Sequence, residues 1–224
     1  WGCDKHEKDA ERPEESRPKI HPPEAHAKAM KDSSGFAEVN GTRLYYEMKG
    51  TGYPLVLIHG FSLDTRMWDG QMAPFTKAYR VVRYDMRGFG KSDLPKDYAF
   101  SHTADLKALL DKLGIPKAHI LGLSMGGKVA IQFAVEYPEA SASLVSVNGV
   151  VDGQGFDKRW SEAWTKIVAA ARQEGPAAAR ALWLDHYMFA PCREQPEVAK
   201  RLKQIVADYS CWHWITMAKS SPPD

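Results

Sequence analysis

The sequence predicts an α/β protein with a mostly parallel sheet and helices on both faces. Short, continuously apolar runs such as residues 55–58 are typical of strands that are covered on both sides. Stretches with apolar residues at helical spacing lie between these runs and would provide that cover. Their alternation along residues 36–150 predicts parallel strands, because each helix carries the chain back to the starting end of the sheet.

The predicted sheet begins with a hairpin. Asn40-Gly41 is a strong turn signal between two β-prone runs, and this hairpin adds an antiparallel edge. Buried strands then alternate with helices. In chain order, the expected strands are residues 36–39, 44–48, 55–58, 81–84, 118–123 and 143–147, and the expected helices are residues 67–77, 103–113 and 125–137.

Single residues set the limits of two helices. Thr103 is expected to cap a helix whose leucines recur at helical spacing until Gly114 ends it. Pro138 disfavours helical geometry in the residue before it, so the helix that starts at Met125 should end at Tyr137.

The composition excludes some classes of partner. The 224 residues carry 30 basic and 28 acidic side chains, so the net charge of +2 gives no electrostatic case for binding nucleic acid or acidic membranes. No apolar run approaches the roughly 20 residues that span a bilayer. Cys3, Cys192 and Cys211 have no metal-binding spacing, so neither a disulfide framework nor a metal site is expected.

Residues 1–34 differ from the rest of the chain. Fifteen of them are Asp, Glu, Lys or Arg and four are Pro, so this segment is expected to be a disordered polar arm. The opening Trp1-Gly2-Cys3-Asp4 resembles the end of a bacterial lipoprotein signal, which would place a lipid tether on Cys3 and the protein in the cell envelope or periplasm. The alternative is an arbitrary fragment boundary at Trp1 and a cytoplasmic protein.

The candidate chemistry is carried by GLSMG at residues 122–126, which matches the pattern G-x-S-x-G. The motif falls between a buried strand and an amphipathic helix, where a nucleophile elbow belongs. Ser124 would occupy a tight, strained turn that exposes its hydroxyl above the sheet. Side chains at Gly122 and Gly126 would collide with the neighbouring strand and helix. The free amides at the helix start would face the reacting centre.

A second motif, His59-Gly60-Phe61, comes directly after the strand at residues 55–58. In proteins with such an elbow, the loop at this place supplies one backbone N–H of an oxyanion hole, and the residue after the nucleophile supplies the other. The predicted donors are therefore the amides of Phe61 and Met125. His59 itself is expected to be a structural residue of the turn rather than a proton carrier.

The ordered series "PLVLIHGFSLDTRMWDGQ", "VVRYDMRGFGKSD", "ALLDKLGI" and "HILGLSMGGKVAIQFAVEYPE" is similar to the α/β-hydrolase superfamily. The similarity covers residues 36 to about 150 and is strongest to the branch of serine esterases, lactonases and cofactor-free haloperoxidases. A serine at position 124 argues against haloalkane dehalogenases and epoxide hydrolases, whose nucleophile there is Asp. The resemblance implies the α/β-hydrolase fold and a reaction that uses no metal or organic cofactor.

A rival interpretation concerns Gly90-Lys91-Ser92, which resembles the end of a phosphate-binding P-loop. The full pattern requires Gly at position 85, where this chain has Asp85, and the lysine does not lead directly into a helix. The family resemblance instead makes residues 87–92 a structural turn after the fourth strand.

Residues 153–224 are expected to form an all-helical cap on a hydrolase core of residues 35–152. Helices are predicted around residues 159–173, 177–187 and 196–209, in a segment rich in Trp, Tyr, Phe and Met. In the family that the chain resembles, such an insertion roofs the nucleophile and shapes the pocket. The aromatic side chains would either form an apolar acyl or alcohol site or pack the cap onto the sheet.

A serine nucleophile needs a general base and an acid that orients this base. In the family, both follow the nucleophile on loops after later strands, and nothing after residue 147 resembles those strands. The chain is therefore expected to be truncated before the acid and the His. His186 and His213 would approach Ser124 from the cap, but each is expected to be ordinary cap structure, so no general base is assigned. Asp152 stands where some relatives keep an alternative acid.

The resemblance implies a serine hydrolase that acts on a small-molecule ester, lactone or related acyl substrate through an acyl-enzyme. One alternative is perhydrolase or haloperoxidase-type chemistry on the same serine. The other is a noncatalytic binding or interaction protein with a hydrolase fold. An open sheet edge at residues 143–147 would also predict poor solubility or recruitment of a partner. Cap side chains would choose the substrate, so the sequence names neither the substrate nor the oligomeric state.

Overall fold

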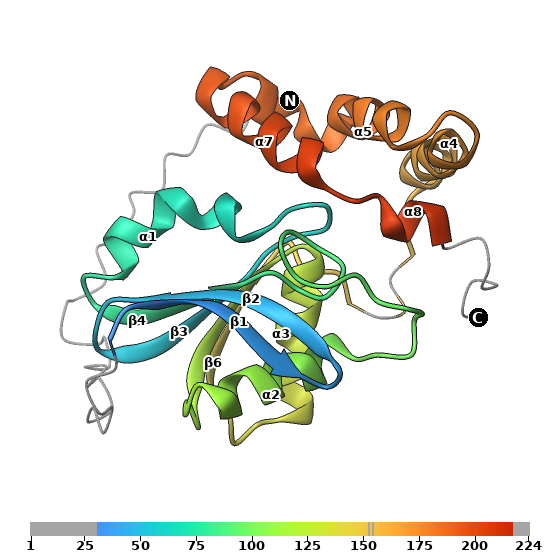
Figure 1. Ribbon diagram of the computed structural model, residues 1–224. Helices are drawn as coiled ribbons and strands as arrows, with labels where there is room; N and C mark the ends of the chain where they lie inside the picture. The colour runs from blue at the N-terminus through green and yellow to red at the C-terminus, as the bar shows by residue number, and fades with distance from the viewer. Residues whose placement is uncertain (1–30, 152, 154, 217–224) are drawn as a thin grey trace, which may run out of the picture.

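The computed structural model describes residues 31–151, 153 and 155–216 (Figure 1). Its centre is a six-stranded sheet of β1 (Ser33–Val39), β2 (Thr42–Lys49), β3 (Tyr53–Ile58), β4 (Tyr79–Tyr84), β5 (Ala118–Leu123) and β6 (Ser141–Val147). The strand order is β1-β2-β4-β3-β5-β6. Strands β4, β3, β5 and β6 run parallel, and the β1–β2 hairpin adds an antiparallel edge. The predicted fold class is confirmed.

Strand β3 is covered on both faces, which explains its continuous apolar sequence. Val56 and Ile58 belong to the larger core cluster, which includes the leucines of α2 and the apolar face of α3. Leu55 and Leu57 point the other way, into a smaller cluster that includes Trp68. The helices of this part are η2 (Thr65–Trp68), α1 (Asp69–Phe75), α2 (His102–Lys112) and α3 (Met125–Glu136).

The start of the sheet lies inside the segment that the sequence assigns to the polar arm. Strand β1 begins at Ser33, where it pairs with Met48 of β2. Antiparallel pairing is made by backbone N–H and C=O groups, so it does not require apolar side chains. Residues 1–30 of the predicted arm, including Cys3, lie outside the described residues.

Two helix boundaries also differ from the expectation. Helix α2 is capped by Ser101, whose hydroxyl accepts a hydrogen bond from the Ala104 N–H, and not by Thr103. The Thr103 hydroxyl instead donates to Glu136 at the end of α3. The helix predicted over residues 67–77 is two shorter elements, η2 and α1. Capping depends on which hydroxyl faces the free amides, and Ser101 and Thr103 are too close in sequence for the pattern to separate them.

Strand β6 is the last strand of the described sheet and pairs on one side only, with β5. Three of its apolar side chains are 38–47% exposed, namely Leu144, Val145 and Val147. Its outer edge therefore presents backbone groups with no strand beside them, next to an apolar surface.

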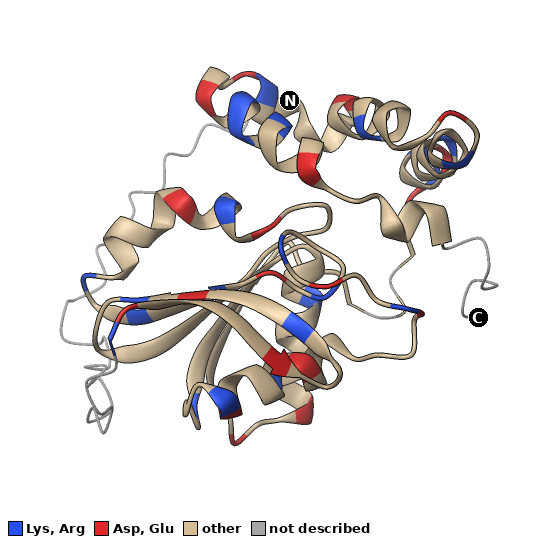
Figure 2. Cartoon of the chain, viewed as in Figure 1, with Lys and Arg blue, Asp and Glu red and all other residues tan. Residues whose placement is uncertain are grey.

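The remaining helices form a layer above the loops that follow β3 and β4 (Figure 1). Figure 2 shows that both basic and acidic residues occur along α4 and along α7 of this layer. No helix of the described part of the chain is long and apolar enough to cross a membrane. The layer consists of α4 (Lys158–Gln173), α5 (Pro176–Asp185), η3 (Tyr187–Phe189), α6 (Ala190–Arg193), α7 (Pro196–Asp208) and α8 (Trp212–Thr216).

Candidate active site

Ser124 lies at a sharp turn between β5 and α3. Its backbone has φ 53° and ψ −115°, a conformation that non-glycine residues rarely adopt. The Ser124 N–H donates to the carbonyl of Val147 at the end of β6, at 2.9 Å. The serine is therefore held in a strained backbone between two parallel strands and the start of a helix.

Gly122 and Gly126, the two glycines of the motif, occupy positions where a side chain would not fit. A Cβ at Gly122 in β5 would collide with the carbonyl of Gly126 at the start of α3. A Cβ at Gly126 would collide with the carbonyls of Ile58 and His59 at the end of β3. The start of α3 is thus pressed against the end of β3, and this brings the turn after β3 next to Ser124.

Two backbone amides near this junction have no hydrogen-bond acceptor among the described residues. Met125 is the first residue of α3, so its N–H has no partner within the helix. Phe61 follows β3, and its N–H donates to no group in the described part of the chain. These are the two amides that the sequence predicts as oxyanion donors.

Phe61 sits in a tight turn of residues 60–63. The Leu63 N–H donates to the Gly60 carbonyl at 3.2 Å and closes the turn. Ser62, the third residue, has φ 62°, which a turn of this kind normally assigns to Gly or Asn. Ser62 is also 1% exposed. The turn is therefore strained and buried at the same residue.

His59 joins the ends of β3 and β4. Its Nε2 accepts a hydrogen bond from the Met86 N–H at 3.0 Å, so the ring proton lies on Nδ1, which donates to the Gly60 carbonyl at 2.8 Å. Burial lowers the pKa of this fully buried ring, against an opposing effect of the nearby Asp85 carboxylate. With both nitrogens engaged, His59 is arranged as a neutral structural residue of the turn.

The polar groups of the turn after β4 form hydrogen bonds within the protein. The Asp85 carboxylate accepts from the N–H groups of Thr65 and Lys91, and burial raises its pKa. The Ser92 hydroxyl donates to the Asp85 carbonyl at 2.6 Å and accepts from the Tyr45 N–H at 2.8 Å. The Lys91 amide and the Ser92 hydroxyl, which in a P-loop would bind phosphate and Mg²⁺ respectively, are thus used to build the turn.

The Phe61 ring is the centre of an aromatic cluster that connects the core to the helical layer. Trp183 of α5 also donates a hydrogen bond from its indole N–H to Ser62 Oγ, at 2.6 Å. Neither Ser62 nor Trp183 is picked out by any sequence motif, because the two are 121 residues apart. Six rings lie with their centroids 5.3–5.8 Å from that of Phe61, namely those of Phe89, Trp164, Trp183, Tyr209, His213 and Trp214.

The two buried histidines of the helical layer are held by groups other than Ser124. His213 stacks on Phe89 with centroids 4.4 Å apart, and its Nδ1 is 2.8 Å from the Tyr209 hydroxyl. Burial, helped by the nearby His59, lowers the pKa of His213 to about 4. His186 Nδ1 accepts from the Met188 N–H. No histidine of the described residues is hydrogen-bonded to Ser124 Oγ. Asp152 lies outside the described residues.

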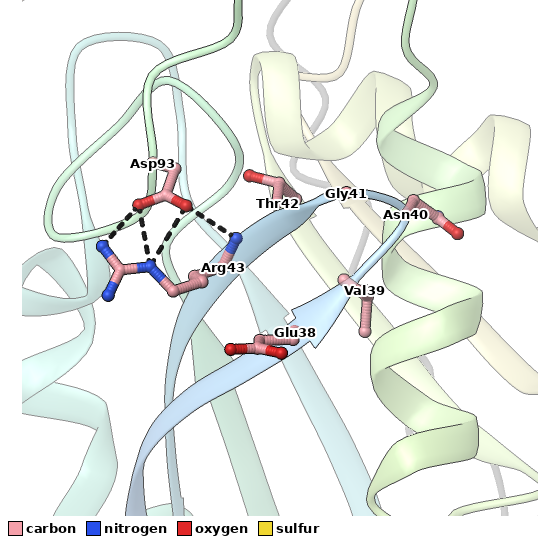
Figure 3. A pocket seen from close by; sticks show the side chains of 7 residues that line it. All are labelled: Glu38, Val39, Asn40, Gly41, Thr42, Arg43 and Asp93. Carbon is pink, nitrogen blue, oxygen red and sulfur yellow. Dashed lines mark hydrogen bonds and ion pairs between the residues drawn. The ribbon is translucent and has the colours of Figure 1, made fainter.

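A polar cavity of about 350 Å³ lies elsewhere, around the β1–β2 turn (Figure 3). Across it, the Arg43 side chain and N–H both bind the Asp93 carboxylate. None of the predicted site residues lines this cavity. Within the described residues, no group of three or more side chains is arranged to hold a metal ion. The cavity is lined by Glu38, Val39, Asn40, Gly41, Thr42, Arg43 and Asp93.

Comparison with known proteins gives consistent similarities. A family model described as the alpha/beta hydrolase fold matches residues 53–205. A protein of Azorhizobium caulinodans named "Putative carbamate hydrolase RutD" is 30% identical over 151 residues, which are 66% of this chain and 57% of that protein. The enol-lactonase of Burkholderia xenovorans LB400 superposes with a TM-score of 0.70 at 28% identity, over 80% of this chain and 70% of that one.

A thermophilic esterase of Thermogutta terrifontis is also similar, with a TM-score of 0.64 and 29% identity over 80% of this chain and 68% of that one. The match to the RutD protein of Azorhizobium caulinodans spans little more than half the length of that protein.

Proposed function

The chain belongs to the α/β-hydrolase family, and on that premise we propose that the protein hydrolyses an ester, a lactone or a related acyl compound with Ser124 as the nucleophile. The observation that carries the proposal is the backbone of Ser124, strained at φ 53° between β5 and the start of α3. Two amides that have no acceptor in the described part of the chain, those of Phe61 and Met125, flank the same junction. Strained backbone of this kind persists where function requires it.

In the proposed reaction, Ser124 Oγ attacks the substrate carbonyl carbon while a general base removes the hydroxyl proton. The carbonyl oxygen becomes an oxyanion, which the N–H groups of Phe61 and Met125 stabilise, and the leaving alcohol takes the proton as the acyl-enzyme forms. Water then attacks the acyl-enzyme, and the acid and Ser124 are released. Loss of one such donor costs about 100- to 1000-fold in rate in a serine protease.

The substrate class follows from the surroundings of Ser124. We propose residues 153–224 as a cap on the core of residues 35–152, with aromatic side chains above the reacting serine. The similar proteins are named as an enol-lactonase, an esterase and a carbamate hydrolase, which all act on a carbonyl that bears an oxygen or nitrogen leaving group. An apolar roof over such chemistry favours a small to medium, largely hydrophobic acyl compound.

A second candidate is a noncatalytic binding protein with the same fold. The observation that favours it is that no histidine in the described residues is hydrogen-bonded to Ser124 Oγ. Without a base, a serine hydroxyl is a weak nucleophile at neutral pH. In this case the aromatic layer would hold a ligand that is not converted.

The decisive experiment is the intact mass of the chain after reaction with a fluorophosphonate probe. A hydrolase gives a single adduct that is lost in Ser124→Ala and kept in the control Ser161→Ala, a serine on the exposed face of α4. An adduct that survives Ser124→Ala would contradict the assignment of the nucleophile. No adduct on a chain with native circular dichroism would favour the binding protein.

A further inference from the structure

The contact between Trp183 and Ser62 is a direct polar link between the helical layer and the proposed oxyanion turn. The indole N–H donates to Ser62 Oγ at 2.6 Å, and both residues are at most 3% exposed. A hydrogen bond in such a dry setting is costly to lose, because the hydroxyl left behind cannot turn to water. The bond therefore holds Ser62 in place more firmly than an exposed one would.

Ser62 needs holding because its backbone is unfavourable. A φ of 62° costs a residue with a Cβ on the order of 1 kcal/mol, and no glycine relieves this strain here. A turn of residues 60–63 closes in this form only while its third residue is left-handed, and the closing bond from the Leu63 N–H holds the Gly60 carbonyl, which lies in the same planar peptide as the Phe61 N–H. The orientation of Phe61 within the turn thus depends on what keeps Ser62 left-handed.

Trp183 is itself fixed by packing, so it can act as a rigid partner. Its ring lies 5.8 Å from that of Phe61, almost perpendicular at 84°, and 5.3 Å from that of Phe189. The Trp183 indole therefore packs against the Phe61 ring and donates its N–H to the Ser62 hydroxyl. The side chains of the two central residues of the turn, Phe61 and Ser62, are thus both contacted by one residue of α5.

We propose that Trp183 is a positioning residue: its indole N–H holds Ser62 in the left-handed conformation and so keeps the Phe61 N–H in place as an oxyanion donor. The catalytic part of this inference rests on the proposed function of Ser124. Its structural part, a hydrogen bond that keeps the turn of residues 60–63 closed, is independent of any reaction.

The test compares two tryptophans that both pack on Phe61. Trp183→Phe removes a bonded N–H, whereas Trp214→Phe removes an N–H that is buried without a partner in the described structure. The readout is hydrogen exchange of the Leu63 amide, which closes the turn, with urea unfolding of each variant as the measure of global stability. Trp183→Phe should speed this exchange about tenfold beyond what its global stability predicts, and Trp214→Phe should not.

A double-mutant cycle with Ser62→Ala completes the test. The variant with both changes should exchange no faster than Trp183→Phe alone, because the two changes remove one bond. Equal exchange in Trp183→Phe and Trp214→Phe, or additive effects of Trp183→Phe and Ser62→Ala, would overturn the inference.

The catalytic part is read from fluorophosphonate labelling of Ser124 on the same variants. Labelling should slow about tenfold in Trp183→Phe, and turnover of an ester should lose kcat with little change in KM. If exchange changes as expected but labelling of Ser124 does not slow, the positioning role is wrong although the bond is real. If the wild type does not label at all, both the proposed function and the oxyanion role are wrong. The exchange result then still shows whether the Trp183–Ser62 bond keeps the turn closed.

Discussion

His59 Nε2 accepts a hydrogen bond from the Met86 N–H at 3.0 Å, and this bond joins the ends of β3 and β4 beneath the candidate site. The ring is fully buried and donates from Nδ1 to Gly60. A histidine is suited to this position because its neutral ring offers one acceptor and one donor on opposite sides. Phenylalanine has a similar shape but neither group.

His59→Phe should therefore lower the free energy of unfolding by about 2 kcal/mol, because the Met86 N–H would stay buried without an acceptor. Urea unfolding at neutral pH measures this loss. The control is His119→Phe, since the His119 ring is only partly buried and bonds one side chain, Ser143. Equal effects of the two changes would contradict the structural role of His59.

Gly126→Ala should prevent the start of α3 from reaching the end of β3. The added Cβ would meet two backbone carbonyls that cannot move independently of the sheet, so we expect a loss of about 3 kcal/mol or failure to fold. Gly35→Ala in β1 is the control, because its Cβ would have open space and an ordinary φ. That change should raise stability by about 0.5 kcal/mol. Thermal or urea unfolding of the two variants would measure both changes in the free energy of unfolding.

Asp105 forms a buried ion pair that should be costly to break. Its carboxylate binds Arg87 through two hydrogen bonds of 2.8 Å and also accepts from the Asn40 amide at 3.0 Å. Asp105→Asn would leave the guanidinium largely buried without its counter-charge, so the free energy of unfolding should fall by about 3 kcal/mol.

The control for this ion pair is Asp111→Asn, which breaks an exposed pair with Lys107 on the same helix. Its unfolding midpoint should not change measurably, because water and salt already screen such pairs. A similar loss in both variants would show that burial does not set the strength of the Arg87–Asp105 pair.

Stability should fall in mild acid, in part through His213. Burial lowers the pKa of this ring in the folded protein to about 4, from an ordinary value of 6.5. As the pH falls below about 6.5, His213 takes up a proton in the unfolded chain but not in the folded protein. The free energy of unfolding therefore decreases as the pH falls, and the decrease levels off near pH 4. Between pH 7 and pH 5 this ring should account for about 2 kcal/mol of lost stability.

The matching variant is His213→Phe, which keeps a ring stacked on Phe89 and near Tyr209 but cannot titrate. The measurement is urea unfolding of both proteins at pH 7 and pH 5. The variant should lose less stability than the wild type over this interval, whatever its stability at pH 7. Parallel losses would rule out His213 as a source of the acid sensitivity.

The edge of β6 should make the 224-residue chain associate. The strand has no charged residue, and Val145 is 47% exposed beside an outer edge without a partner strand. Val145→Lys should reduce association seen by light scattering, because a charge on an edge strand opposes pairing with another strand. Val135→Lys is the control, because this valine is 76% exposed but lies on helix α3 and not on an edge strand. An equal reduction by both would indicate a general effect of charge.

The sequence by itself determined the strand–helix alternation, the place of the elbow and the residues of the turn after β3. These features are local: four apolar residues in β3, or two glycines around Ser124, restrict the backbone whatever lies far away. The hairpin edge and the three long helices after residue 157 were predicted on the same local grounds.

Only the tertiary structure decided which residues surround the turn. Trp183 meets Ser62 across 121 residues, and the rings of Phe61 and Trp214 come together in the same way. Such contacts depend on how the helical layer packs onto the sheet, which is a property of shape and volume rather than of any local pattern. The left-handed Ser62 is the clearest case: no local pattern marks it, yet it is buried and its hydroxyl accepts a hydrogen bond from the Trp183 indole N–H.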